Sequence, residues 1–460
     1  MDLLGVRSLP FLARRNYYYE FKHLLLWSAL AGLIEGQFAS IIVAKTFGGG
    51  KLLITIATTT PAACYIFSLF WGMLCVGRPK IRVITMLGVG AVLLTGSIAA
   101  IPATPLGAVW FIGQIAAVQI LLAGVGTVRS ALWKSNYPQS ARGRITARLQ
   151  AVRFVISITA VLLAAWMCDH DPTSYRFVFP CVAGLGAAAL LVLGRIHMRG
   201  ERNELAHARA PQRQADLREG LVEPLNLTVL LSPGHMVGRM AAILRRDRKF
   251  ARYCVAQALT GLSNFMTLPV IVAVITRELD VGFAWGFWIS TALIQAMPQL
   301  FRLGSLHRWA RLFDRVGVVR FRVVSVAVWS VSLVFGMAAT LVAIGGDRIG
   351  PVYLPLAVGL FALRGLGNGI ALGAGALAWN LGHLHFARSD EAEVYMGIHV
   401  FLTGLRGLIA PAVGMLLWTL VGAWVWIIAI ALAVLSGRMY LAMAREELAV
   451  ETRNSVGRSG

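Results

Sequence analysis

Charged residues are scarce in this chain, and carboxylates are the scarcest. Only 14% of the 460 residues are charged, whereas 57% are hydrophobic and the mean hydropathy is +0.70. A water-soluble domain usually has about 25% charged residues. This composition therefore excludes a soluble globule and places the chain in a lipid bilayer.

Cysteine and familiar catalytic motifs are also scarce. The five cysteines show no CxxC spacing, which argues against a disulfide framework or a zinc site. The patterns GxxxxGK[ST], GxSxG and HExxH do not occur, so neither ATP-driven transport nor common hydrolase chemistry is indicated. We expect no enzyme activity, no metal and no cofactor.

Long apolar runs are what the sequence does contain. A helix needs about 20 apolar residues to cross a hydrocarbon core of ~30 Å. Twelve stretches qualify, near 23–44, 52–76, 83–101, 107–133, 147–168, 177–195, 253–276, 283–301, 323–344, 351–378, 396–418 and 421–441. The sequence thus predicts an all-α integral membrane protein with twelve transmembrane helices.

The net charge of +22 arises from 43 Lys and Arg residues against 21 Asp and Glu residues. If the N-terminus is cytoplasmic, only five basic residues fall in outer segments, namely Lys45, Lys51, Arg176, Arg277 and Arg348. This positive-inside bias predicts a multi-pass protein of the cytoplasmic (inner) membrane with both termini cytoplasmic. Anionic lipid headgroups on the cytoplasmic side account for the charge, so nucleic-acid binding is not needed to explain it.

The chain contains an internal repeat. Phe21, Ala29, Leu30, Gly32, Leu33 and Glu35 match Phe250, Ala258, Leu259, Gly261, Leu262 and Asn264 at one offset. Segments 71–82 and 149–156 match 309–320 and 402–409 in the same order. Repeated halves are typical of transporters in which a central site faces alternate sides of the membrane.

The repeat predicts two pseudo-symmetric six-helix bundles. We expect an N-terminal half at 1–195, a cytoplasmic linker at 196–249, a C-terminal half at 250–445 and a cytoplasmic tail at 446–460. The end of the linker, 236–249, has apolar residues at helical spacing and a basic terminus, which is typical of a helix on the inner membrane surface. A solvated linker helix is an equal alternative.

A short motif follows the expected eighth helix. It reads Ala310-Arg-Leu-Phe-Asp314-Arg315-Val-Gly317-Val-Val-Arg320. Together with the spans and the repeat, it resembles the major facilitator superfamily, whose loops after the second and eighth spans have Gly-x-x-x-Asp-Arg-x-Gly followed by basic residues. In the first copy Val76 and Gly77 replace Asp-Arg. The resemblance covers about residues 15 to 445 and implies a transporter fold, but it names no substrate.

The charged side chains that lie deepest inside the expected spans are Glu35, Arg129, Arg153, Arg364 and Arg406. A charge near the bilayer centre costs about 2.5 to 3.5 kcal/mol. These side chains must therefore face the protein interior or water, where they are candidates for the functional site.

Glu35 is the only carboxylate well inside an expected span, and Gln37 follows it closely. Desolvation raises and a nearby arginine lowers the pKa of such a carboxyl, which is how a proton-coupling site is built. Its repeat partner, Asn264, cannot titrate. Glu35 is thus predicted to bind a proton or a cationic group, and the alternative is a structural ion pair with one arginine.

The arginines suit an anion. Arg153 and Arg406 are repeat-related, and Arg364 lies near the middle of the tenth expected span. A guanidinium holds a carboxylate or phosphate with two parallel hydrogen bonds. Packing, gating or snorkelling to the interface is the alternative, and Arg129 is predicted to be structural. Gln119 either lines the cavity or joins helices.

The resemblance also implies a cytoplasmic gate, in which the motif's aspartate meets the start of the facing helix. Here Asp314, Arg315 and Gly317 are expected opposite Arg144 and its basic neighbours. On the other side the signs are exchanged, with basic residues in the degenerate motif facing an acidic loop. The expected latch pairs Arg78, Lys80 and Arg82 with Asp390, Glu391 and Glu393.

The sequence therefore predicts a monomeric secondary active transporter that works by alternating access. We expect coupling to protons and a small, anionic organic solute as substrate. Two alternatives stay open, namely an exporter of drug-like cationic or amphipathic compounds, and a non-transporting membrane protein for lipid handling or sensing on the same fold.

Overall fold

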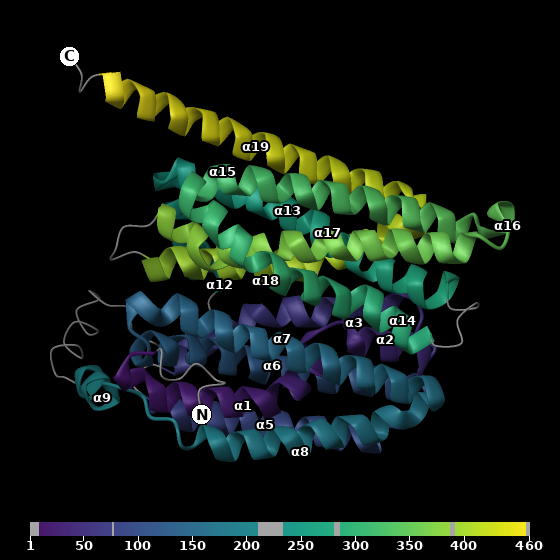
Figure 1. The fold of residues 1–460 in the computed structure, drawn as a ribbon, viewed down its shortest axis with the longest axis horizontal. Helices are drawn as coiled ribbons and strands as arrows, with labels where there is room; N and C mark the ends of the chain where they lie inside the picture. Colours follow the sequence, from purple (N-terminus) through teal and green to yellow (C-terminus); the bar gives the residue numbers. More distant parts are fainter. Residues whose placement is uncertain (1–8, 76–77, 210–232, 280–285, 387–391, 457–460) are drawn as a thin grey trace. The chain divides into compact units, whose positions relative to one another are not determined.

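A computed structural model of the chain describes residues 9–75, 78–209, 233–279, 286–386 and 392–456. Every regular element in these residues is helical (Figure 1). The chain divides into two compact units. The first comprises Met1–Gly48 and Cys64–Ala241, and the second comprises Gly49–Ala63 and Ala242–Gly460.

The first unit is a set of long helices with short connections. Its elements are α1 (Phe11–Glu35), α2 (Phe38–Lys45), η2 (Cys64–Ile66), α4 (Phe67–Leu74), α5 (Lys80–Ser97), η3 (Ile98–Ala100), α6 (Pro105–Asn136), α7 (Gln139–His170), η4 (Pro172–Ser174), α8 (Tyr175–Leu193), α9 (Glu201–Arg209) and most of α12 (Pro233–Arg246). Helix α1 packs against α7 and α8, and α5 packs against α6 and α8. Helix α8 therefore contacts both α1 and α5.

Local sequence fixes where these helices begin and bend. The Thr104 side chain accepts a hydrogen bond from the Gly107 N–H at 3.1 Å, and Pro105 takes the first turn of α6, where no N–H is needed. Between α1 and α2 the backbone at Gly36 is extended, and the two helices meet at a bend of 49°. The first apolar run is thus a broken helix.

The second unit is also helical. Its elements are α3 (Lys51–Ala63), α13 (Arg248–Ala273), the π-helix η5 (Val274–Glu278), α14 (Gly286–Thr291), the π-helix η7 (Ala292–Ala296), α15 (Met297–Ile344), α16 (Gly346–Ile349), α17 (Tyr353–Leu381), η8 (Gly382–His385), α18 (Ala392–Val421) and α19 (Trp424–Val456).

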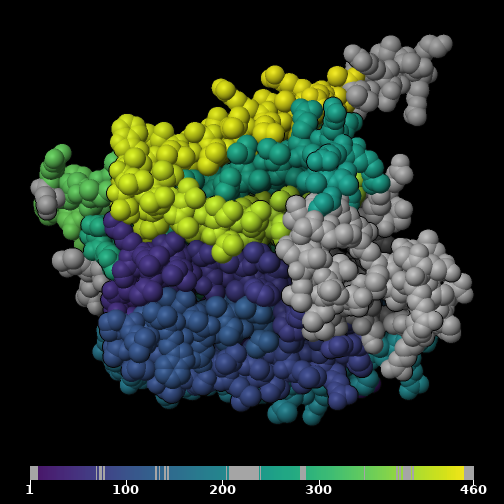
Figure 2. Space-filling model, turned by 180° about the vertical axis from the view of Figure 1, so that it is seen from behind, coloured from purple at the N-terminus to yellow at the C-terminus, as the bar shows by residue number. Residues whose placement is uncertain are grey.

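Helix α13 organises the second unit. It packs against both α18 and α19, and the face drawn in Figure 2 shows these three helices side by side. Helices α15 and α17 form another close pair, and α3 packs on α13 and α18. A Cβ atom on Gly407 of α18 would lie 2.5 Å from the Ala62 Cβ, so α3 approaches α18 too closely for any larger side chain.

Residues that the repeat relates make the same contact in each unit. The Trp71 indole N–H donates to the Ile120 carbonyl at 2.8 Å, and the Trp309 indole N–H donates to the Ile370 carbonyl at 2.8 Å. A Cβ on Gly32 would lie 2.9 Å from the Ser157 Cα, and a Cβ on Gly261 would lie 2.4 Å from the Arg406 Cδ. Gly32 therefore permits a close approach between the backbones of α1 and α7, whereas Gly261 of α13 leaves room for the Arg406 side chain of α18.

The described residues contain nine helical segments long and apolar enough to cross a membrane, or ten when the bent pair α1 and α2 counts as one. This establishes a multi-pass membrane protein but does not confirm twelve spans. The shortfall has two causes. Segment Gly286–Ile344 runs on for 59 residues through two expected spans, and Lys51–Ile66 is too short to count.

Gly317 marks the change of direction inside α15. Its φ of 73° and ψ of 173° are not helical. This region of backbone conformation is essentially restricted to glycine and costs other residues about 1–3 kcal/mol. Gly317, the last glycine of the motif, therefore allows the chain to change direction between the two halves of α15.

We predict that Gly317→Ala lowers the thermal unfolding midpoint of the purified protein, because alanine is strained at this φ. Gly304→Ala is the matched control. Gly304 is helical, belongs to the same helix α15, and would place its Cβ in open space. Alanine there should raise the midpoint, since it is favoured over glycine within a helix by about 0.5–1 kcal/mol. A Gly317→Ala protein as stable as the parent would contradict this account.

Candidate functional site

The break between α1 and α2 carries an ion pair. Glu35 is the last residue of α1, and its carboxylate accepts a hydrogen bond from the Arg153 guanidinium of α7. The two side chains are 35% and 33% exposed, although Ile34 beside them is fully buried. The pair is thus only half-buried.

The polar residues around the break satisfy its backbone. The Gln119 side chain donates to the Ile34 carbonyl, which is one of the carbonyls that a helix end leaves without an internal partner. Gln37 accepts a hydrogen bond from the Ser40 hydroxyl at 3.2 Å through its side chain and at 2.6 Å through its carbonyl. Both glutamines therefore hold the ends of the break in place next to Glu35.

The second unit has no equivalent of this break among its described residues. Asn264 lies inside the continuous helix α13, and its carbonyl accepts a hydrogen bond from the Thr267 hydroxyl at 2.9 Å. The irregular backbone described in this unit lies elsewhere, in the π-helical turns η5 and η7 and at Gly317 of α15. The repeat therefore preserves the packing glycines but not the titratable break.

Arg406 is bound into the packing of its unit. Its Nη1 donates to the Gln257 carbonyl at 3.0 Å, and its Nη2 donates to the Thr403 hydroxyl at 2.8 Å. Only its Nε has no hydrogen-bond partner among the described residues. Gly261 leaves the space that the arginine stem fills. This arginine joins α13 to α18.

Arg364 is in a different situation. Its side chain is 2% exposed, and neither Nε nor Nη2 has a hydrogen-bond partner in the described part of the chain. One turn further along α17, the Asn368 Oδ1 is also buried without such a partner. The Ser332 hydroxyl binds the Arg364 backbone carbonyl at 2.9 Å and leaves the guanidinium untouched. Arg364 and Arg406 therefore have separate surroundings within the second unit.

The expected gate residues are only partly described. Asp314 and Arg315 are exposed, as are Arg78 and Arg82. Lys80 is buried, and its ammonium donates to the Cys75 carbonyl at 2.8 Å. Asp390, Glu391 and the side chains of Arg144 and Glu393 lie outside the described residues. The latch stays a prediction.

Sequence reasoning missed a second ionic cluster in the first unit. Glu20 and His23 of α1 are 1% and 0% exposed, and both contact Arg129 of α6. Glu20 was overlooked because the first span was expected to begin at residue 23, whereas α1 begins at Phe11, and His23 stood at the very start of that expected span. A signal was present in the sequence, since a Glu-x-x-His pair places both side chains on one face of a helix.

Arg322 was missed for the same reason, because the ninth span was expected to begin at residue 323. Its side chain is 5% exposed, and its Nε donates to the Tyr440 hydroxyl at 3.3 Å. The Tyr440 hydroxyl donates in turn to the Gln257 Oε1 at 3.3 Å. Because Gln257 also binds Arg406, one polar network connects α13, α15, α18 and α19.

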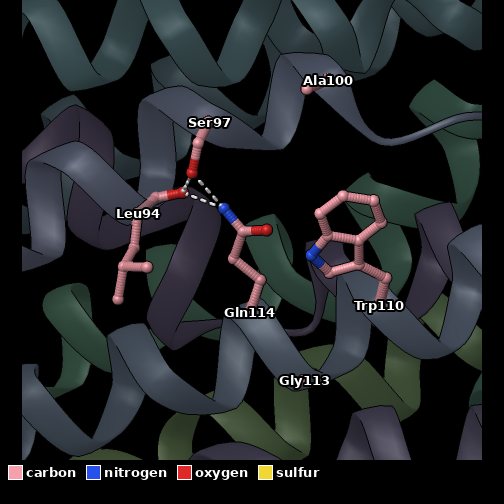
Figure 3. A pocket seen from close by; sticks show the side chains of 6 residues that line it. All are labelled: Leu94, Ser97, Ala100, Trp110, Gly113 and Gln114. Carbon is pink, nitrogen blue, oxygen red and sulfur yellow. Dashed lines mark hydrogen bonds between the residues drawn. The ribbon is translucent and has the colours of Figure 1, made fainter.

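Figure 3 shows a hollow of about 430 Å³ between α5 and α6 of the first unit. Its floor is polar, because the Gln114 amide donates to the Leu94 carbonyl and to the Ser97 hydroxyl. Trp110, which is 57% exposed, forms one wall. The donors of Gln114 are already bound and most of the lining is apolar, so this hollow has few features of a substrate site.

Comparisons with solved structures identify the fold. A mutant form of the nucleoside transporter NupG matches with a TM-score of 0.59 and 14% identity, over 94% of this chain and 99% of that one. A POT family transporter in complex with 5-aminolevulinic acid matches with a TM-score of 0.64 and 14% identity, over 96% and 99%. A D-xylose-proton symporter matches with a TM-score of 0.61 and 13% identity, over 92% and 96%.

These structures are transporters of the major facilitator type, and none of them is an enzyme. The chain has the major facilitator fold. No protein-family profile matches the sequence, and no curated protein matches it either. Identities of this size show the fold of a major facilitator transporter and leave the substrate to be argued from the chain's own residues.

We predict that Arg364→Met raises the thermal unfolding midpoint of the ligand-free protein, because it removes a buried charge that lacks hydrogen bonds. Taking an ion out of water costs several kcal/mol, which an apolar side chain of similar volume avoids. Arg406→Met is the matched control and should lower the midpoint, because it removes the hydrogen bonds that Arg406 donates to the Gln257 carbonyl and the Thr403 hydroxyl. If both variants lose stability equally, Arg364 is an ordinary packing residue.

Proposed function

We propose that this protein is a secondary active transporter that works by alternating access, is coupled to protons at Glu35 and moves a small organic anion. The half-buried Glu35–Arg153 pair at the helix break carries this proposal. Unwound or broken helices near the middle of the membrane are where transporters of this kind place their sites. The major facilitator fold supports the transport class.

The ion pair favours a proton over a cationic solute. A cation would have to displace the covalently tethered Arg153 from the carboxylate, whereas a proton neutralises Glu35 and releases the guanidinium. The uncompensated positive charge of Arg153 would then favour an anionic solute over a cationic one, so protonation and substrate binding would be linked. The drug-cation exporter has no such support.

Arg364 supports an anionic substrate. A buried guanidinium with two unpartnered nitrogens among the described residues is unstable unless an anion reaches it. Asn368, one turn away on the same helix, offers an amide for a second hydrogen bond to a carboxylate or phosphate. We place the substrate's anionic group at these two residues and assign Arg406 to packing.

The proposed topology has twelve crossings. Segment Gly286–Ile344 would extend roughly 90 Å as a straight helix, about three times the hydrocarbon thickness, so we divide it at Gly317. Helices α3 and α4 are counted together as one broken span. We further propose a monomer in the cytoplasmic membrane with both termini inside, in contact with anionic lipids there.

The function is tested with purified protein in liposomes, using a panel of radiolabelled small carboxylates and phosphates with and without an inward pH gradient. Accumulation of at least one compound that depends on the gradient supports the proposal. A protein that drives neither accumulation nor exchange for the whole panel, but exchanges labelled lipids between leaflets, would instead be a lipid-handling protein on the same fold.

We predict that Glu35→Gln abolishes gradient-driven accumulation but preserves substrate exchange at equal pH, because an amide has the shape of the carboxyl and cannot carry a proton. Glu446→Gln is the matched control. Glu446 is also paired with an arginine, Arg252, at 2.8 Å, but it is exposed. Its amide variant should transport as the parent does. Unchanged accumulation by Glu35→Gln would remove Glu35 from the coupling role.

The proposed cytoplasmic latch is tested by reversing charges. Because Lys80 binds the Cys75 carbonyl, it is left intact, and Arg78→Glu with Arg82→Glu changes only exposed side chains. We expect the double variant to favour the inward-open state, and additional reversal of Asp390, Glu391 and Glu393 to restore the balance. Each exposed pair contributes about 0.2–1 kcal/mol, so labelling of single cysteines from the cytoplasmic side should change modestly. Identical labelling in all variants would refute the latch.

A further inference from the structure

Three side chains of the first unit form a buried cluster that the Glu35 site does not use. The Arg129 Nε lies 3.5 Å from the Glu20 Oε1, and the Arg129 Nη2 contacts the His23 Nε2. The Trp133 indole donates to the Glu20 Oε1 at 3.2 Å. The cluster contains one anion, one cation and one imidazole, so its net charge is zero when His23 is neutral.

The partners of His23 determine its protonation state. Its Nδ1 lies 2.9 Å from the Ala189 carbonyl, which can only accept, so Nδ1 carries the hydrogen. Its Nε2 faces a guanidinium, which can only donate, so Nε2 must present its lone pair. His23 is therefore neutral in this arrangement. The lone pair that a proton would need is the one that Arg129 occupies.

Other charged groups surround this cluster on each neighbouring element. Directly after helix α6 comes Tyr137, which lies within electrostatic range of Glu20 and Arg129. Helix α7 contributes Arg153, whose charge and that of Glu35 reach Arg129, and Arg148, which interacts with Tyr17 of α1. Helix α8 contacts His23 through the Ala189 carbonyl. His197 lies in the segment after α8, and its carbonyl accepts a hydrogen bond from the Asn16 side chain of α1.

Arg129 can move between two partners without leaving the cluster. Its contact with Glu20 is a charge contact that lacks hydrogen-bond geometry, while its contact with His23 is a hydrogen bond. A rotation that completes the bond to Glu20 would free the Nε2 lone pair. The imidazolium that forms on protonation would then lie beside Glu20 and Arg129 as they neutralise each other.

We propose that His23 is a second proton-binding site, in which a proton and the Arg129 guanidinium compete for the Nε2 lone pair. Proton uptake forms an N–H bond on Nε2 and breaks the hydrogen bond from Arg129, which turns to Glu20. Arg129 thereby couples the protonation of His23 to the position of α6 against α1. This site is distinct from Glu35 and does not depend on the identity of the transported solute.

The experiment uses the proton itself as the probe. The full chain, labelled with nitrogen-15 in its nine histidines, is placed in lipid nanodiscs and titrated by NMR from about pH 8.5 to about pH 5. The nitrogen shifts distinguish the two neutral tautomers from the imidazolium, and His23→Gln identifies the His23 signals. In the neutral protein we expect hydrogen on Nδ1 and none on Nε2.

Arg129→Gln is the decisive variant. It removes the competitor and leaves the Glu20 carboxylate nearby, so the midpoint of His23 protonation should rise by about one pH unit or more. Arg148→Gln removes an exposed arginine that makes no described contact with His23, and it should leave the midpoint unchanged. Glu20→Gln should lower the midpoint, because it removes the anion that stabilises the imidazolium and attracts Arg129.

Two results would overturn the proposal. One is a neutral His23 with its hydrogen on Nε2, and the other is a midpoint that Arg129→Gln does not move, which would make the cluster a packing contact. If Arg129→Gln does not fold, Glu20→Gln decides the matter, since a lowered midpoint supports the site and an unchanged one rejects it. Because no solute is involved, these outcomes are independent of the transport assay.

Discussion

The cost of placing a charge among apolar residues is the constraint on which the rest of this structure depends. Each ionised side chain inside a span costs several kcal/mol unless it is partnered or reaches water. Glu35 has Arg153 and partial exposure, Glu20 has Arg129 and Trp133, and Arg406 is held by Gln257 and Thr403. Among the described residues Arg364 differs from these, because its buried Nε and Nη2 have no hydrogen-bond partner. Since a buried charge in this state is costly, it is informative about a ligand that could pair with it.

The two units divide the charge unequally. In the described residues, the buried or half-buried carboxylates inside spans, Glu20 and Glu35, belong to the first unit, and each faces an arginine. In the second unit the buried charged side chains are Arg322, Arg364 and Arg406. Two of these three, Arg322 and Arg406, donate hydrogen bonds to uncharged oxygen atoms of neighbouring residues. On the function proposed above, the proton chemistry would lie in the first unit and the affinity for anions in the second.

The sequence predicted the membrane class and the fold resemblance, because these depend on composition and local pattern. It did not predict the break at Gly36, since glycine in an apolar run is compatible with either a straight or a broken helix. It also missed Glu20 and His23. Hydropathy averages place a span where charge is absent, whereas α1 includes charged residues whose partners lie elsewhere in the chain. His23 and Arg129 are 106 positions apart, and no local pattern connects them.

The position of both proposed proton sites on α1 has a mechanistic consequence. Glu35 and His23 are separated along this helix by about 18 Å at the usual helical rise. Arg153 binds the first, Arg129 binds the second, and the two arginines lie within electrostatic range of each other. Protonation of Glu35 would leave Arg153 without its counter-ion, and the added positive charge would favour a move of Arg129 towards Glu20. That move would expose the His23 lone pair. A proton bound at Glu35 would thus make His23 available for a second proton, and α1 itself would not have to change its conformation.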